Sequence, residues 1–214
     1  VEVLRDGAQS ILEAIEVPPE SPSGEAELLE ILVREVLHEL ERMYDAGVRG
    51  IKLINAYQEN YPGDGPNLMA VYAFAAEHNM VILNHAWPND IIMKISAEFS
   101  NIDFIFGHYG KGSDPVLKAR DNVYANIWAY GPQDWMDRGI AECGAGKFMF
   151  GSDGFLNCLS VGLGPIVCAD TSEENKRNML GLTLAGLLDK VGALPEALCH
   201  GVTEDTEKKN HGRV

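Results

Sequence analysis

The chain contains 214 residues, of which 46% are hydrophobic and 23% charged, a composition typical of a globular protein with one core. Its net charge of −15 argues against binding to nucleic acid or to anionic membranes, because both require basic patches. The sequence has no apolar run of the roughly 18 residues that span a bilayer and no recognisable signal peptide. Its four cysteines form no CxxC motif. We therefore expect a cytoplasmic protein that contacts no membrane.

The predicted elements begin with a helical segment over residues 1–46. The Pro- and Ser-rich stretch PPESPSG separates a short helical pattern from a long one over residues 25–46, where apolar residues recur at helical spacing. Strand-like and helix-like stretches then alternate from residue 47 to residue 191. We expect residues 1–200 to form a single domain and residues 201–214 to form a polar tail.

The alternating part contains five strands, which begin near residues 48, 80, 102, 122 and 147. The helices between and after them are predicted over residues 67–78, 88–99, 114–120, 132–144 and 171–191. This alternation predicts an α/β fold with a parallel sheet of βαβ units. A Rossmann or P-loop nucleotide site is not expected, because neither glycine-rich motif is present.

Three of the predicted strands end in side chains that can bind a metal or transfer a proton. MVILNHAW contains His85, IDFIFGHYGKG contains His108, and KFMFGSDGF contains Asp153. Parallel α/β folds place their sites at the carboxyl ends of strands, and two imidazoles with one carboxylate are a suitable ligand set for zinc. The structural alternative is that both histidines pair with the backbone and that Asp153 caps the next helix.

The ordered segments GVRGIKL, VILNHAW, NIDFIFGHYG, NVYANIWAY, AGKFMFGSDGF and TSEENKRNMLG resemble the amidohydrolase superfamily, in its aminocarboxymuconate-semialdehyde decarboxylase-like branch. The resemblance covers roughly residues 36–190. It implies a TIM-barrel (β/α)₈ fold with a divalent metal, expected to be zinc, at the carboxyl ends of the strands. By this match, His85, His108 and Asp153 are metal ligands. His108 also binds or orients the attacking water, and Asp153 handles the proton.

The chain departs from the family pattern at its amino-terminal side. The family's first strand carries a His-x-His pair of metal ligands, and this sequence contains no such pair. Three βα units of about 30 residues each should precede the five strands, but only 47 residues do. We therefore predict an incomplete TIM-barrel-like fold, either because the chain is a fragment or because the barrel is reduced. Lys52 lies where some amidohydrolases carry a carbamylated lysine that bridges two metals; this branch usually lacks that role, and Lys52 is left unassigned.

Four residues beyond the strand ends are predicted to contact a small-molecule substrate: Trp87, Tyr109, Lys111 and Trp128. Lys111 is suited to hold a carboxylate as a point charge. For each of the four residues, a role in packing or in a solvated loop is the alternative.

The predicted function is that of a metal-dependent hydrolase acting on an amide, ester or lactone bond through a metal-activated water. Asp153 would shuttle the proton and His108 would polarise the electrophile. One alternative is a metal-dependent, non-oxidative decarboxylase of the same family. Another is a truncated, non-catalytic barrel that acts as a binding or oligomerisation module and covers its open sheet edges as a homo-oligomer.

Overall fold

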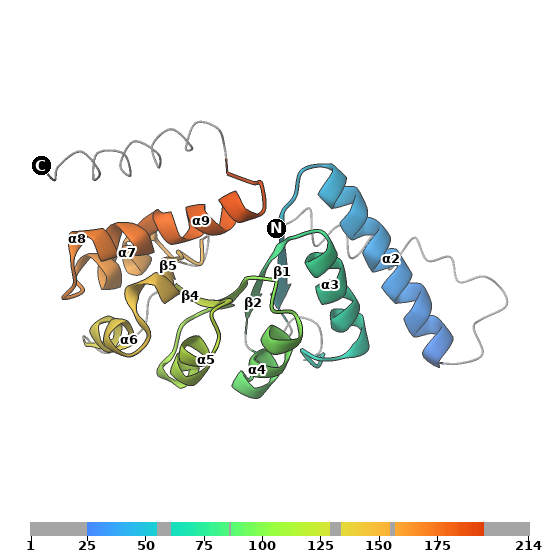
Figure 1. Ribbon diagram of the computed structural model, residues 1–214, viewed down its shortest axis with the longest axis horizontal. Helices are drawn as coiled ribbons and strands as arrows, with labels where there is room; N and C mark the ends of the chain where they lie inside the picture. The colour runs from blue at the N-terminus through green and yellow to red at the C-terminus, as the bar shows by residue number, and fades with distance from the viewer. Residues whose placement is uncertain (1–24, 55–60, 86, 129–133, 155–156, 195–214) are drawn as a thin grey trace, which may run out of the picture.

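The computed structural model describes residues 25–54, 61–85, 87–128, 134–154 and 157–194, and its centre is a sheet of five parallel strands (Figure 1). The strands lie in chain order and are β1 (Gly50–Ile54), β2 (Val81–His85), β3 (Phe104–Gly107), β4 (Val123–Ile127) and β5 (Phe148–Phe150). Each begins within two residues of its predicted start. In the described part of the chain, β1 pairs only with β2 and β5 only with β4, so the barrel is open. The predicted incomplete TIM-barrel-like fold is confirmed.

Helices connect the strands and cover both faces of the sheet. They are α2 (Glu25–Asp45), α3 (Pro66–Glu77), α4 (Asn89–Glu98), α5 (Asp114–Ala119), α6 (Trp135–Cys143), α7 (Leu159–Val167), α8 (Glu173–Arg177) and α9 (Thr183–Lys190). A π-helical turn over Asn178–Leu182 joins α8 to α9, so the last predicted helix is interrupted. Figure 1 shows α3 to α6 on one side of the sheet and α9 on the other. Within the described ranges, no helix is both long and apolar enough to cross a bilayer.

The two faces of the sheet pack against different partners, because successive side chains of a strand point to opposite faces. Residues such as Ile82, Phe104 and Phe148 are fully buried in the main core, which α3 to α6 cover. On the opposite, concave face, Val81 and other apolar residues pack against α9. A closed barrel would fill this interior with side chains from all its strands. Here α9 covers the amino-terminal half of the concave face and leaves the carboxyl-terminal half for a site.

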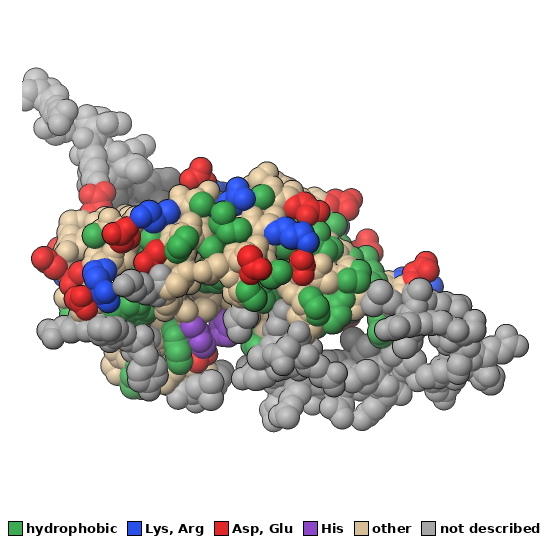
Figure 2. Space-filling model, turned by 90° about the horizontal axis from the view of Figure 1, so that it is seen from below, with side chains coloured by type: hydrophobic (Ala, Val, Ile, Leu, Met, Phe, Trp, Pro, Cys, Tyr) green, Lys and Arg blue, Asp and Glu red, His purple; other side chains and the backbone are tan. Residues whose placement is uncertain are grey.

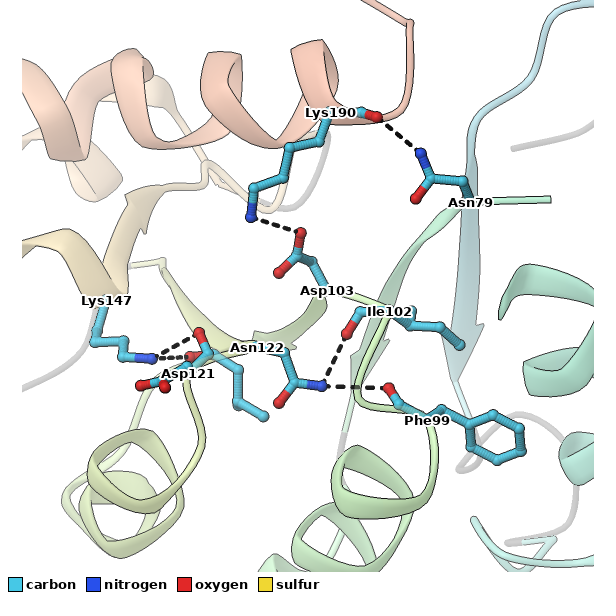
Figure 3. A network of polar contacts seen from close by, with 9 residues as sticks. Asn79, Phe99, Ile102, Asp103, Asp121, Asn122, Lys147 and Lys190 are labelled. Atoms are coloured by element: carbon cyan, nitrogen blue, oxygen red, sulfur yellow. Dashed lines mark hydrogen bonds and ion pairs between the residues drawn. The ribbon is translucent and has the colours of Figure 1, made fainter. Parts of the chain in front are cut away.

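The amino-terminal edge of the sheet is held by a polar network (Figure 3). Lys190 of α9 forms an ion pair with Asp103 at 3.1 Å, and the Asn79 amide donates a hydrogen bond to the Lys190 carbonyl at 2.7 Å. The Asn122 amide donates to the carbonyl oxygens of Ser96, Phe99 and Ile102. The Lys147 ammonium donates to those of Arg120, Asp121 and Val123. These bonds fix the strands and α9 at the edge that lies opposite the carboxyl ends.

Helix α7 was not predicted, because its sequence LSVGLGPIV contains two glycines and a proline, which are weak helix formers. Packing against β5 stabilises it instead. A Cβ atom on Gly162 would lie 2.3 Å from the Gly151 carbonyl oxygen and 3.0 Å from the Phe150 ring. Glycine at this position therefore allows α7 to approach the strand closely.

Candidate active site

The structure brings His85, His108 and Asp153 together at the carboxyl edge of the sheet. His85 is the last residue of β2, His108 directly follows β3, and Asp153 lies three residues after β5. The two imidazole rings have centroids 4.3 Å apart, and Nε2 of His108 lies 3.6 Å from Oδ2 of Asp153. This separation allows an ion pair but is longer than a hydrogen bond. Figure 2 shows histidine side chains in a recess of the surface, next to acidic atoms.

Two of these residues have an unusual backbone conformation. His108 has φ +67° and Asp153 has φ +49°, and among the described non-glycine residues only Asn79 shares the left-handed region. Side chains other than glycine rarely adopt this conformation, which costs about 1–2 kcal/mol per residue. Such strain clusters at functional sites, where the surrounding structure holds it in place. The left-handed turns direct both side chains towards the same space.

Glycines make room for the polar side chains of the concave face. A Cβ atom on Gly107 would lie within 2 Å of two atoms of the His85 ring, so the ring rests directly against the backbone of the neighbouring strand. In the same way, the Asn126 amide occupies the place of a Cβ on Gly151. Asn126 was not singled out in the sequence, although a polar residue between the buried Ala125 and Ile127 is a usable signal for an inward position.

The surroundings of both histidines favour the neutral form of the imidazole, because they lower the pKa of each ring. Burial, together with the positive charges of Lys52 and of a protonated His108, lowers the pKa of His85 to about 4. Burial also lowers the pKa of His108, and the nearby Asp153 carboxylate partly opposes this shift. Neutral imidazole is the form that binds metals and accepts protons.

Lys52 lies on the same face of the sheet, and the sequence had left it unassigned. In the register of β1 with β2, Ile54 is opposite His85, which places Lys52 two residues earlier on the concave side. Although Lys52 is exposed as a residue, the protein around its ammonium group lowers its pKa to about 8, against the opposing effect of Asp153.

Trp128 and Lys111 are two of the four predicted substrate contacts. The Trp128 ring stacks on the His108 ring with a centroid distance of 3.8 Å and an interplanar angle of 18°. Trp128 therefore forms a wall of the site. Lys111 begins a 3-10 turn over Lys111–Ser113, and its side chain lies outside the described part of the structure.

Trp87 and Tyr109, the other two, belong to the main core beneath the helices. Trp87 is 6% exposed and meets the Tyr72 ring edge-on, whereas Tyr109 is 4% exposed and donates its hydroxyl to Asp114 at 2.6 Å. Both side chains are used in packing on the convex side of the sheet. We therefore do not propose that either residue contacts the substrate.

The chemistry of the three site residues fits part of a metal centre. Nε2 of His108 is buried without a hydrogen-bond partner, and a neutral imidazole nitrogen beside a carboxylate is a suitable ligand for a divalent cation. Among the described residues, however, no group of three or more His, Cys, Asp and Glu side chains is arranged to hold a metal. These residues supply an incomplete ligand set.

The pKa of His85 leads to a test by acid titration. In the unfolded chain this residue binds a proton near the ordinary pKa of 6.5, whereas in the folded chain its pKa is about 4. Because the unfolded state binds more protons between these values, the free energy of unfolding should fall as the pH drops from 6.5 to 4. We expect His85→Asn to lose less stability than the parent over this window. The difference should be about 1–2 kcal/mol, because the ring is only partly buried and keeps part of its solvation. Urea unfolding at a series of pH values measures it, and parallel curves for the two proteins would contradict the burial of a neutral His85.

Comparison with solved structures reveals the same architecture in proteins of low sequence identity. An uncharacterised TIM-barrel protein from Bordetella bronchiseptica superposes with a TM-score of 0.65 at 15% identity, over 75% of this chain and 64% of that protein. A dihydroxybenzoic acid decarboxylase from Polaromonas, with bound manganese and the inhibitor 2-nitroresorcinol, gives a TM-score of 0.59 at 12% identity, over 73% and 66% of the two chains. A putative 2-pyrone-4,6-dicarboxylic acid hydrolase from Pseudomonas putida gives 0.55 at 17% identity, over 72% and 68%. The present chain thus spans about two thirds of the length of these proteins.

The sequence itself carries the family assignment. No curated protein sequence matches the chain. The profile of the amidohydrolase family matches residues 22–185, which is well over half of the chain and includes all five strands and the three site residues. The family resemblance seen in the strand-end motifs is confirmed, and the chain belongs to the amidohydrolase family.

Proposed function

We propose that the chain contains the proton-transfer residues of a metal-dependent hydrolase. This hydrolase acts on an amide, ester or lactone bond of a small molecule. The observation that supports this proposal is the pair formed by His108 and Asp153. Both residues follow strands in a left-handed conformation, and their Nε2 and Oδ2 atoms lie 3.6 Å apart beside His85. Membership of the amidohydrolase family favours hydrolysis.

His85, His108 and Asp153 would provide ligands for a divalent cation, and the incomplete set requires further ligands from outside these three residues. When bound, such a cation lowers the pKa of a coordinated water towards 7. The Asp153 carboxylate would accept the proton of the attacking water and return it to the leaving group. The neutral His108 ring would polarise the substrate carbonyl, and Trp128, stacked on this ring, would fix its plane.

Non-oxidative decarboxylation is the second candidate, and the structural similarity to a dihydroxybenzoic acid decarboxylase favours it. In this reaction the bond between the ring carbon and the carboxylate breaks, and carbon dioxide leaves. The ring carbon then takes a proton, which Asp153 in its protonated form would donate. Both reactions thus use Asp153 as the group that moves a proton.

Two assays distinguish these functions. The purified chain is analysed for zinc and manganese by mass spectrometry and is then supplied with either ion. Hydrolysis of 2-pyrone-4,6-dicarboxylate is followed by loss of the pyrone absorbance, and decarboxylation of 2,6-dihydroxybenzoate by release of carbon dioxide. We expect hydrolysis that a chelator abolishes and added metal restores.

Release of carbon dioxide without hydrolysis would instead support non-oxidative decarboxylation as the function. A chain that binds no metal and turns over neither compound would contradict both enzymatic functions. That outcome would favour the non-catalytic module, for which the native mass then shows whether the chain assembles with itself.

A further inference from the structure

We propose that Asn126 is a further substrate-binding residue of the site, whose carboxamide binds an uncharged group of the substrate that both donates and accepts a hydrogen bond. Hydroxyl and amide groups are of this kind. The inference rests on the proposed function and adds to it one specificity-determining residue and the group that this residue selects.

The register of the sheet places Asn126 at the level of His85. In the pairing of β2 with β3, His85 is opposite Gly107. In the pairing of β3 with β4, Phe106 is opposite Ala125, so the residues that follow them, Gly107 and Asn126, are neighbours as well. Because the His85 ring lies over Gly107, it is separated from the Asn126 side chain by about one strand spacing, which is about 4.8 Å. Asn126 therefore lies about as deep in the concave face as His85.

Asn126 lies between the part of the concave face that α9 covers and the rings of the site. The preceding side chain on this face, Tyr124, packs against the apolar cluster that includes residues of α9. The following one, Trp128, stacks on the His108 ring. Side chains two positions apart on a strand are separated by about 6.6 Å, which is about the length of a six-membered ring with one substituent. A small substrate that contacts His108 can therefore place its inner end on Asn126.

The carboxamide of Asn126 is held in the same way as the His85 ring. A Cβ atom on Gly151 would overlap Nδ2, Oδ1 and Cγ of Asn126, so the carboxamide lies against the backbone directly after β5, two residues before Asp153. Gly107 gives the His85 ring the same kind of support. A polar group fixed in this way loses little conformational freedom when it binds a ligand, which favours selective hydrogen bonding.

An asparagine at this position contradicts the local preference of the strand. Asparagine is depleted in strands, and the neighbours Ala125 and Ile127 are fully buried in the core. Natural sequences break such local rules mainly at functional sites. The carboxamide has no charge and offers two donor hydrogens and an acceptor oxygen, so it can pair with both halves of a hydroxyl or amide group. An apolar group at the same place would remove water from the carboxamide without replacing its hydrogen bonds, which costs free energy.

The test compares two uncharged ligands of the same shape. Benzamide and acetophenone share the ring and the carbonyl, but benzamide has an NH₂ group where acetophenone has a methyl group. Binding is measured at pH 7 from the NMR signals of the His85 and His108 rings, which report contact with this site. We expect the parent chain to bind benzamide about 10-fold more tightly, the effect of one or two hydrogen bonds between uncharged groups. Asn126→Leu should abolish this preference, and Asn126→Asp, which still accepts from the NH₂ group, should retain it.

A second measurement tests the position of Asn126 without any ligand. The carboxylate of Asn126→Asp should raise the pKa of both histidine rings by about 0.5 or more, because a nearby negative charge stabilises imidazolium. The matched control is Asn101, which is exposed at the opposite edge of the sheet and donates its amide to the Ala76 carbonyl. Asn101→Leu should keep the ligand preference, and Asn101→Asp should leave the pKa of each histidine unchanged.

A preference for benzamide that persists in Asn126→Leu would overturn the proposal. Equal binding or no binding of the two ligands to the parent chain would do the same, as would histidine pKa values that stay unchanged in Asn126→Asp. Thermal unfolding shows that each variant is folded. Neither measurement requires metal or turnover, so a chain that shows both effects but turns over no substrate would support the role of Asn126 and contradict the enzymatic function.

Discussion

Replacement of Asp153 by asparagine is expected to lower kcat by about 10²–10⁴-fold, the usual contribution of a positioned general acid or base. Asparagine has nearly the same shape as aspartate, so the left-handed turn at φ +49° is retained. Its amide cannot accept a proton from water or return one to a leaving group. The measurement is the steady-state rate with whichever of the two assay compounds the parent chain turns over, at saturating metal.

The matched control is Asp90→Asn, which removes an exposed carboxylate from the first turn of α4. We expect this variant to keep the parental kcat. Metal content is determined for both variants, since a loss of metal from Asp153→Asn would show that the carboxylate acts as a ligand as well. An Asp153→Asn protein that retains full metal content and full kcat would exclude Asp153 from proton transfer.

Replacement of Gly107 by alanine is expected to disrupt the site by forcing the His85 ring away from the sheet. The new methyl group would overlap two ring atoms, at 1.6 Å from Cδ2 and 1.9 Å from Nε2. Relief of such overpacking typically costs about 1–3 kcal/mol of stability, and the displaced imidazole can no longer lie beside His108. We expect lower stability by urea unfolding together with loss of turnover and of bound metal.

Two further variants show whether the effect passes through His85. Gly110→Ala alters the same stretch of sequence, but a Cβ atom there meets nothing within 4 Å, so this variant should behave as the parent. In a chain that already carries His85→Ala, the Gly107→Ala change should cost little, because the ring that it overlaps is gone. An equal loss of stability in both backgrounds would show that the penalty has another origin.

The order of elements could be predicted from the sequence because the physical signals are local. Strands buried on both faces appear as continuous apolar runs, and the helices between them have apolar residues at helical spacing. The clustering of His85, His108 and Asp153 followed from the same reasoning, since parallel strands align their carboxyl ends. Helix α7 and the π-helical turn before α9 did not follow, because close packing at Gly162 and against β5 decides them rather than helix propensity.

The direction of each side chain at the strand ends was decided by the backbone. Simple alternation after β3 would place Gly107 and Tyr109 on the concave face and His108 on the convex face. The left-handed conformation of His108 reverses this order, so that the imidazole enters the site and Tyr109 enters the core. A side chain that follows a strand therefore cannot be assigned to a face by counting residues.

The sequence by itself determined the parallel α/β architecture, the family and the edge of the sheet that carries the candidate site, because each depends on strand order and residue type. Only the tertiary structure decided which polar residues share that space. It added Lys52 and Asn126 to the concave face, assigned Trp87 and Tyr109 to the core, and placed α9 over the amino-terminal half of the concave face. The physical reason is that these contacts join residues far apart in the chain, and their geometry depends on strand register and on two left-handed turns.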